Sequence, residues 1–158
     1  MKAFATFMIF SCALLGAPAQ AENWTRIEDT DQAFWDADAR LEVDLDSVRA
    51  VDVADAKDAD GNALAGPFYV ATRRAVLSAS AQESMRYDSE IAAEYYSCAG
   101  AEPLRTVNGS VLAAEIAGGK QKIKYQGGPG ETYLFGPAQT GWQSNLQALV
   151  CARAKSTS

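Results

Sequence analysis

Two segments alternate apolar with polar or charged side chains, and this pattern constrains the fold more than any other feature of the chain. Residues 41–46 read Leu-Glu-Val-Asp-Leu-Asp, and residues 120–125 read Lys-Gln-Lys-Ile-Lys-Tyr. Because side chains two residues apart share one face of a strand, each segment predicts a β-strand. In the second segment three lysines would share one face, and Ile123 and Tyr125 would share the other. Exposed lysines are typical of a strand at the edge of a sheet.

Residues that favour a pleated surface predict further strands. We expect one at residues 24–27, another that begins at Phe34-Trp35, and a central strand at residues 68–77, although Arg73-Arg74 interrupts its pattern. Residues 91–98 favour a strand, with a helix as the alternative.

Turn-forming and polar residues separate these segments. Residues 47–49 should turn the chain, and residues 55–66, rich in Asp, Ala and Gly, should form a loop. Residues 78–90 predict either a long turn or a helical piece, and residues 133–137 predict an irregular loop.

A β-hairpin is predicted around Asn108-Gly109. This dipeptide favours the positive φ angles of a two-residue type I′ turn, so residues 104–107 and 111–116 should pair with each other. Gly118-Gly119 offers a second turn before the lysine-rich strand.

The chain should end in a helix. Thr140 can cap it, and Gln143 three residues later completes a Thr-x-x-Gln capping box. The following residues recur at three- and four-residue steps, and the apolar ones form a stripe that can lie on the sheet: Trp142, Leu146, Leu149, Val150 and Arg153.

An uncharged segment near the start predicts a cleavable signal peptide. Residues 3–16 carry no charge, and Ala19-Gln20-Ala21 is the small-x-small pattern that signal peptidase cuts. The uncharged run is shorter than the roughly 20 residues that cross a bilayer, which argues against a membrane anchor. We expect residues 1–21 to be removed, leaving residues 22–158 as one soluble domain in the periplasm, at the cell surface or outside the cell.

Export would place two of the three cysteines in an oxidising compartment. Cys12 leaves with the signal peptide, and Cys98 and Cys151 remain as an even pair without the Cys-x-x-Cys spacing of a redox site. We expect a structural disulfide that ties the C-terminal helix to the strand carrying Cys98, and hence an α+β fold. On the chain-entropy model, closing this loop stabilises the fold by about 4 kcal/mol.

Charge and composition exclude several classes of function. The chain has 20 acidic and 14 basic residues, and a net negative protein lacks the concentrated basic surface that nucleic-acid binding requires. There is no histidine, which excludes Ser-His-Asp and Cys-His catalysis and most zinc sites. A hydrolase that uses two carboxylates stays open, but we expect no enzyme and no cofactor.

The acidic turn around Asp58 and Asp60 partly matches a calcium loop, which supplies several oxygens from one tight turn. With Gly61 at the invariant glycine position, however, Ala56 stands at the first ligand position and Pro67 at the twelfth, where a bidentate Glu belongs. We therefore expect no bound metal.

Candidate partner-contact residues gather late in the chain. Lys120, Lys122 and Lys124 would meet a polyanion or an acidic partner or, as the alternative, form a solvated strand face. Tyr133 and Phe135 would anchor the same contact if exposed, or cover the core if not.

Five features follow one another through the chain: Trp24, the Val-Asp-Leu-Asp-Ser-Val segment at residues 43–48, Cys98, Trp142 and Cys151. Their order and spacing resemble the surface-adhesin protein E family of bacterial exported domains. The resemblance implies an antiparallel sheet of about six strands with a C-terminal helix tethered by the cysteine pair, and binding of host matrix proteins as in the best-known member.

We accordingly expect an exported module that binds a protein partner rather than a small ligand. A periplasmic structural or envelope-maintenance domain without enzymatic activity is the alternative, and a carboxylate-dependent hydrolase is the third reading.

Overall fold

The computed structural model describes residues 23–28, 39–99, 102–107, 109–127 and 132–157. Within these ranges the chain forms nine strands and two helices: β1 (Trp24–Arg26), β2 (Arg40–Val51), β3 (Ala56–Lys57), β4 (Phe68–Val76), α1 (Ala79–Met85), β5 (Ser89–Ser97), β6 (Leu104–Thr106), β7 (Leu112–Ala117), β8 (Lys120–Gln126), β9 (Tyr133–Gly136) and α2 (Gly141–Ser156). The expected signal peptide and the strand expected at Phe34-Trp35 lie outside the described residues.

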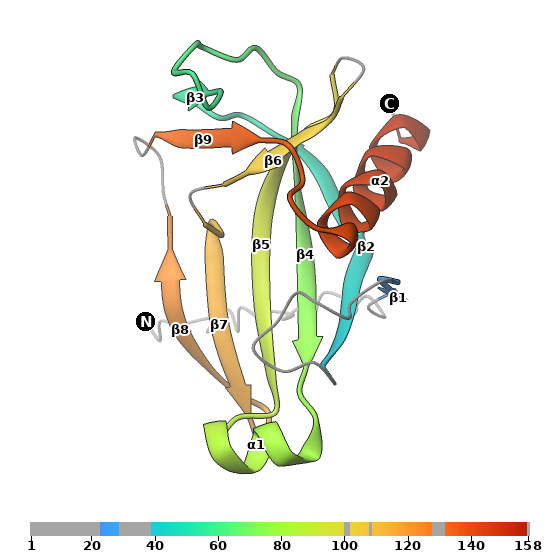
Figure 1. Ribbon diagram of the computed structural model, residues 1–158, viewed down its shortest axis with the longest axis vertical. Helices are drawn as coiled ribbons and strands as arrows, with labels where there is room; N and C mark the ends of the chain where they lie inside the picture. The colour runs from blue at the N-terminus through green and yellow to red at the C-terminus, as the bar shows by residue number, and fades with distance from the viewer. Residues whose placement is uncertain (1–22, 29–38, 100–101, 108, 128–131, 158) are drawn as a thin grey trace, which may run out of the picture.

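The strands form one sheet whose long members lie side by side (Figure 1). Its order is β1-β2-β4-β5-β6-β9-β3, and β7 and β8 form a second branch beside β5. The pairs are antiparallel except for β3 with β9, which is parallel. The α+β class with a C-terminal helix is therefore confirmed, but the described sheet has nine strands instead of about six.

The predicted hairpin at residues 104–116 is wrong. Among the described residues, β6 and β7 do not pair with each other, because both pair with β5, one at each end of it. β5 is nine residues long and offers room for two successive partners on one edge. The turn at Gly118-Gly119 is confirmed, with φ angles of 53° and 75°, and it joins β7 to β8.

β2 is longer than its alternating pattern predicted. The expected turn at residues 47–49 is instead a bulge inside the strand, where the register with β4 shifts between Asp44 and Arg49. The hydroxyl of Ser47 donates to the carbonyl of Asp44 (2.6 Å) and accepts from the backbone N–H of Thr72 in β4 (2.8 Å). A side chain thus replaces the ladder hydrogen bond that the bulge removes.

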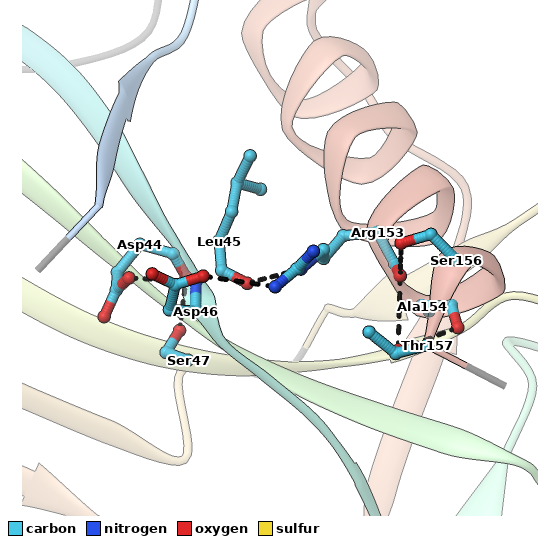
Figure 2. Close-up of polar contacts among 8 residues, drawn as sticks. All are labelled: Asp44, Leu45, Asp46, Ser47, Arg153, Ala154, Ser156 and Thr157. Carbon is cyan, nitrogen blue, oxygen red and sulfur yellow. Dashed lines mark hydrogen bonds and ion pairs between the residues drawn. The ribbon is translucent and has the colours of Figure 1, made fainter. Parts of the chain in front are cut away.

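The same bulge holds α2 in place (Figure 2). The guanidinium of Arg153 donates to the carbonyl of Leu45 (3.3 Å) and to the Asp46 carboxylate (3.2 Å). α2 packs on β2 and β5, and Trp142, Leu146 and Val150 of its predicted stripe are buried in the core beneath it. Within the Val-Asp-Leu-Asp-Ser-Val segment, Ser47 therefore closes the bulge, and the carbonyl of Leu45 and the carboxylate of Asp46 contact the helix.

The ends of α2 confirm one prediction and correct another. Cys151 is bonded to Cys98 just beyond β5, so the predicted disulfide is present. Thr140 is the N-cap residue, but its side chain makes no capping hydrogen bond. Gln143 accepts instead from the backbone N–H of Gln139 (2.8 Å), so the predicted capping box does not form.

A second core lies on the other side of the sheet, under β3 and β9. Both strands fall in segments predicted to be loops, because two and four residues are too short to show a period. Phe68 packs against Phe135 with ring centroids 5.1 Å apart, and Tyr95 against Tyr133 at 5.0 Å. Of the two segments left open, residues 78–90 contain α1, capped by the Ser78 hydroxyl, and residues 91–97 are strand.

Candidate functional site

The three lysines predicted to contact a partner lie on β8, which is an edge strand (Figure 1). Within the described ranges β8 pairs with β7 alone, and all seven of its residues are exposed. Lys122 lies opposite Glu115 of β7, and Nζ of Lys124 lies 2.8 Å from Oε1 of the same carboxylate. Hydrogen bonding to Glu115 raises the pKa of Lys124 above its ordinary value of 10.5.

Lys120 and Lys122 form no ion pair with any described residue. The strand alternation puts these two side chains on one face, and Lys124 reaches the carboxylate on that face. Among the described residues, two of the three positive charges on this edge of the sheet have no ion-pair partner, and Glu115 balances the third.

The expectation that Ile123 and Tyr125 share the other face is wrong. A bulge in β8 pairs Tyr125 with Ala113 but Ile123 with the adjacent Ala114. Consecutive residues of β7 point to opposite faces, so the two apolar side chains of β8 do as well. Ile123 is 53% exposed and Tyr125 43%, and each face of the strand thus presents one large apolar side chain.

Within the described structure, one side of the β8 backbone also has no strand beside it. The two-residue turn at Gly118-Gly119 makes residues 117 and 120 a hydrogen-bonded pair. Along an antiparallel ladder, hydrogen-bonded pairs alternate with pairs whose N–H and C=O groups point away from the neighbouring strand. Gln121 and Ile123 belong to pairs that are not hydrogen-bonded to β7. Their backbone groups therefore point toward the open edge of the sheet.

Tyr133 and Phe135 are not part of this surface. They are 7% and 0% exposed and belong to the second core, which confirms the alternative that they cover the core. Their strand, β9, pairs with β6 and β3, whereas β8 pairs with β7. The lysines and the two aromatic rings are thus not brought together.

A buried ionic cluster, which the sequence did not single out, lies on the α2 side of the sheet. Glu94 is 2% exposed, and its two carboxylate oxygens accept from Nε of Arg73 (3.1 Å) and from Nη2 of Arg105 (2.6 Å). The hydroxyl of Tyr96 lies 3.3 Å from the same carboxylate, and the Arg73 guanidinium lies 5.7 Å from the centre of the Trp142 ring in α2.

The electrostatics of this cluster favour a structural role. Burial would raise the pKa of Glu94, but the guanidiniums of Arg73 and Arg105 outweigh burial and hold the pKa below its ordinary value of 4.5. Both oxygens already accept charged hydrogen bonds, so this carboxylate is poorly placed to act as a base toward a substrate.

Two further carboxylates approach each other on the same face, since Glu90 lies directly opposite Glu115. Directly opposite residues have Cβ atoms about 4.5–5.5 Å apart, which lets their carboxyl groups reach the spacing of about 5–9.5 Å that a hydrolase with two carboxylates uses. However, Glu90 lies 3.6 Å from Arg73 Nη1 and Glu115 is held by Lys124. A groove of about 730 Å³ lies elsewhere, along residues 50–54 and 66–68.

The acidic turn uses its oxygens internally. Asp58 accepts from the backbone N–H groups of Asp60 and Asn62 (2.9 and 2.8 Å) and from the Asn62 side chain (2.9 Å). The Asn62 side chain and these backbone donors hold the pKa of Asp58 below its ordinary value. In the described part of the chain, no three Cys, Asp or Glu side chains come together as a metal site.

Comparison with family models, curated proteins and solved structures gives no match to this chain. Neither described helix combines the length and the hydropathy needed to span a bilayer. The assignment of function therefore depends on the geometry of the chain itself.

Proposed function

We propose that this protein is an exported binding module of the surface-adhesin protein E type, which contacts a protein partner through β8 and has no enzymatic activity. The observation that carries the proposal is β8 itself, an edge strand with seven exposed residues and an open backbone side. The lysines and the bulge of β8 protect this edge from pairing with another copy of itself, but they leave its seven residues exposed, and an exposed edge can accept a strand of complementary charge.

The chemistry of the surface suits a protein partner. Ile123 and Tyr125 supply exposed apolar area, and Lys120 and Lys122 supply charge that steers association. The disulfide between Cys98 and Cys151 fits an oxidising compartment, in agreement with the expected signal peptide.

The absence of enzymatic activity is proposed because the carboxylates that lie close to one another are already paired with Arg or Lys side chains. Glu94 is bound by two guanidiniums, and Glu90 and Glu115 each lie beside one cation. A carboxylate hydrolase needs an acid and a base directed at a substrate cleft, and the groove along residues 50–54 lies away from these groups.

Site-specific photo-crosslinking in the producing cells tests the proposal. A photoreactive amino acid replaces Ile123 on β8 or, as the matched control, Leu134 on β9, which is also apolar and exposed (36%). We expect one discrete protein adduct from position 123 and none from position 134, because the two strands belong to different branches of the sheet.

Protease added to intact cells provides the second measurement, because it reaches a surface protein but not a periplasmic one. Digestion together with the adduct from position 123 would support the binding module. A protected protein without an adduct at either position would refute it and favour the periplasmic structural domain.

A further inference from the structure

We propose that β8 binds an acidic, extended peptide segment that adds to the sheet as an antiparallel strand. The inference rests on the proposed function and specifies the chemistry and the binding mode of the partner. It concerns residues 120–123, which precede the bulge of β8 and keep a regular alternation with β7.

The open backbone edge supplies the first requirement of strand addition. The N–H and C=O groups of Gln121 and Ile123 point away from β7 and have no strand beside them in the described structure. An antiparallel peptide would exchange hydrogen bonds with these two residues, as in other cases where an extended segment extends a sheet.

The side chains supply the second requirement, which is selectivity. Lys120 and Lys122 share one face and have no carboxylate partner in the described structure, so acidic residues at every second position of the peptide would lie opposite them. The intervening residues would lie opposite Gln121 and Ile123 on the other face, where Ile123 is 53% exposed. The preferred segment therefore alternates acidic with β-branched residues.

The same lysines disfavour a second copy of the chain as the occupant. Two β8 strands paired with each other would bring lysines close to lysines, and like charges across a strand pair are destabilising. An acidic strand removes this repulsion, so the lysines that protect the edge from self-pairing also select the partner.

The test measures binding of the purified protein to a synthetic peptide, acetyl-Thr-Glu-Val-Glu-Val-Glu-Thr-amide, by fluorescence anisotropy. In a second peptide both Val residues carry a backbone N-methyl group. In a third peptide the first and the last Glu residues carry one instead. In the proposed arrangement the Val N–H groups point to β8 and the Glu N–H groups point away. We expect methylation of Val to weaken binding at least about tenfold and methylation of Glu to change it less than about threefold.

Protein variants test the same contact from the other side. Ile123→Pro removes an outward N–H while sparing the ladder with β7, and should weaken binding about tenfold relative to Ile123→Thr. Lys120→Gln with Lys122→Gln should weaken it and flatten its salt dependence, whereas Lys155→Gln on the exposed end of α2 should not. Unchanged melting temperatures establish that each variant is folded.

Equal affinities for the two methylated peptides would overturn the proposal, because contact by charge alone does not depend on the direction of the N–H groups. If heparin binds as tightly as the peptide, and if the variant with Lys120→Gln and Lys122→Gln loses this binding, the surface would be assigned to a polyanion instead. A dimer in sedimentation experiments that Ile123→Pro dissociates would assign the edge to a second copy. If a protein adduct forms at position 123 but no peptide binds, the binding module stands and strand addition fails.

Discussion

Glu94 is the most buried charge of the ionic cluster, and its carboxylate binds the guanidiniums of Arg73 and Arg105, two residues that are themselves less than one tenth exposed. Replacing Glu94 with Gln would leave Arg105 buried without an ion-pair partner among the described residues, and Arg73 with only the partly exposed Glu90, 3.6 Å from its Nη1. Breaking a buried pair from one side typically costs about 3–5 kcal/mol. We therefore expect Glu94→Gln to lower the free energy of unfolding by about that amount, measured by urea denaturation followed by circular dichroism.

Glu115→Gln is the matched control for this prediction. It removes a carboxylate from the adjacent strand whose partner Lys124 has a half-exposed side chain, and such surface pairs contribute about 0–1 kcal/mol. Equal losses for the two variants would show that the buried cluster has no special role in stability.

Ser47 provides a second test at the residue scale. Ser47→Ala removes the acceptor of the Thr72 N–H and the donor to the Asp44 carbonyl, so the bulge in β2 loses the contact that closes it. We expect a loss of about 1–2 kcal/mol in the free energy of unfolding. Ser84→Ala, on an exposed position of α1, should change it by less than about 0.5 kcal/mol, and a comparable effect of both would contradict the role of Ser47.

Among the elements, α2 is held by the disulfide and by contacts that do not need it. Its apolar side chains are buried against β2, and Arg153 binds the bulge. Replacing Cys98 and Cys151 with Ala should therefore lower stability by about 2–5 kcal/mol while α2 stays docked. Amide hydrogen exchange at neutral pH should show that α2 is still protected in the double variant. Its amides should exchange faster than in the unchanged protein, by a factor that corresponds to the lost stability.

Loss of all protection in α2 with a protected sheet would contradict this prediction, because it would mean that the disulfide alone positions the helix. Single replacements of either cysteine are a poor substitute for the double variant, since each leaves a free thiol that can form new disulfides.

Element length decided what the sequence could predict. Leu41–Asp46 and the lysine strand show a period over six residues, residues 68–77 contain many side chains that favour a pleated surface, and α2 shows a period over several turns. β3 and β9 have two and four residues and derive their pairing from contacts distant in sequence, Ala56 with Tyr133 and Lys57 with Leu134. The hairpin at Asn108-Gly109 failed for a related reason, because pairing with β5 outweighed a local turn preference.

The candidate site was predictable in part for the same reasons. The lysines of β8 were identified from alternation alone, but the bulge that separates Ile123 from Tyr125 has no signal in that pattern. Arg73 interrupts an apolar strand, which marks it as unusual, yet its partner Glu94 and the second arginine that binds Glu94, Arg105, lie 21 and 32 positions further along the chain. Only the pairing of β4, β5 and β6 brings the three together.

At the scale of the whole molecule, stability should depend on the protonation of paired carboxylates. Burial would raise the pKa of Glu42, but hydrogen bonds and charge from Arg74 and Arg40 hold it below its ordinary value of 4.5, and Glu94 is shifted in the same direction. Between the lowered folded values and the ordinary unfolded ones, the unfolded chain binds more protons than the folded one. Both groups therefore contribute stability that is present above about pH 4.5 and is lost as the pH falls through the folded pKa values.

Urea denaturation at a series of pH values between 7 and 3 measures this dependence. We expect the free energy of unfolding to fall steeply below about pH 4.5 in the unchanged protein, and to fall less steeply in Glu42→Gln, where one of the linked protons is gone. Glu83→Gln, an exposed position on α1 without an ion pair among the described residues, should follow the unchanged protein. If stability stayed constant down to pH 3.5, or if Glu42→Gln and Glu83→Gln had the same slope, the arginine-paired carboxylates would not control the acid stability of this fold.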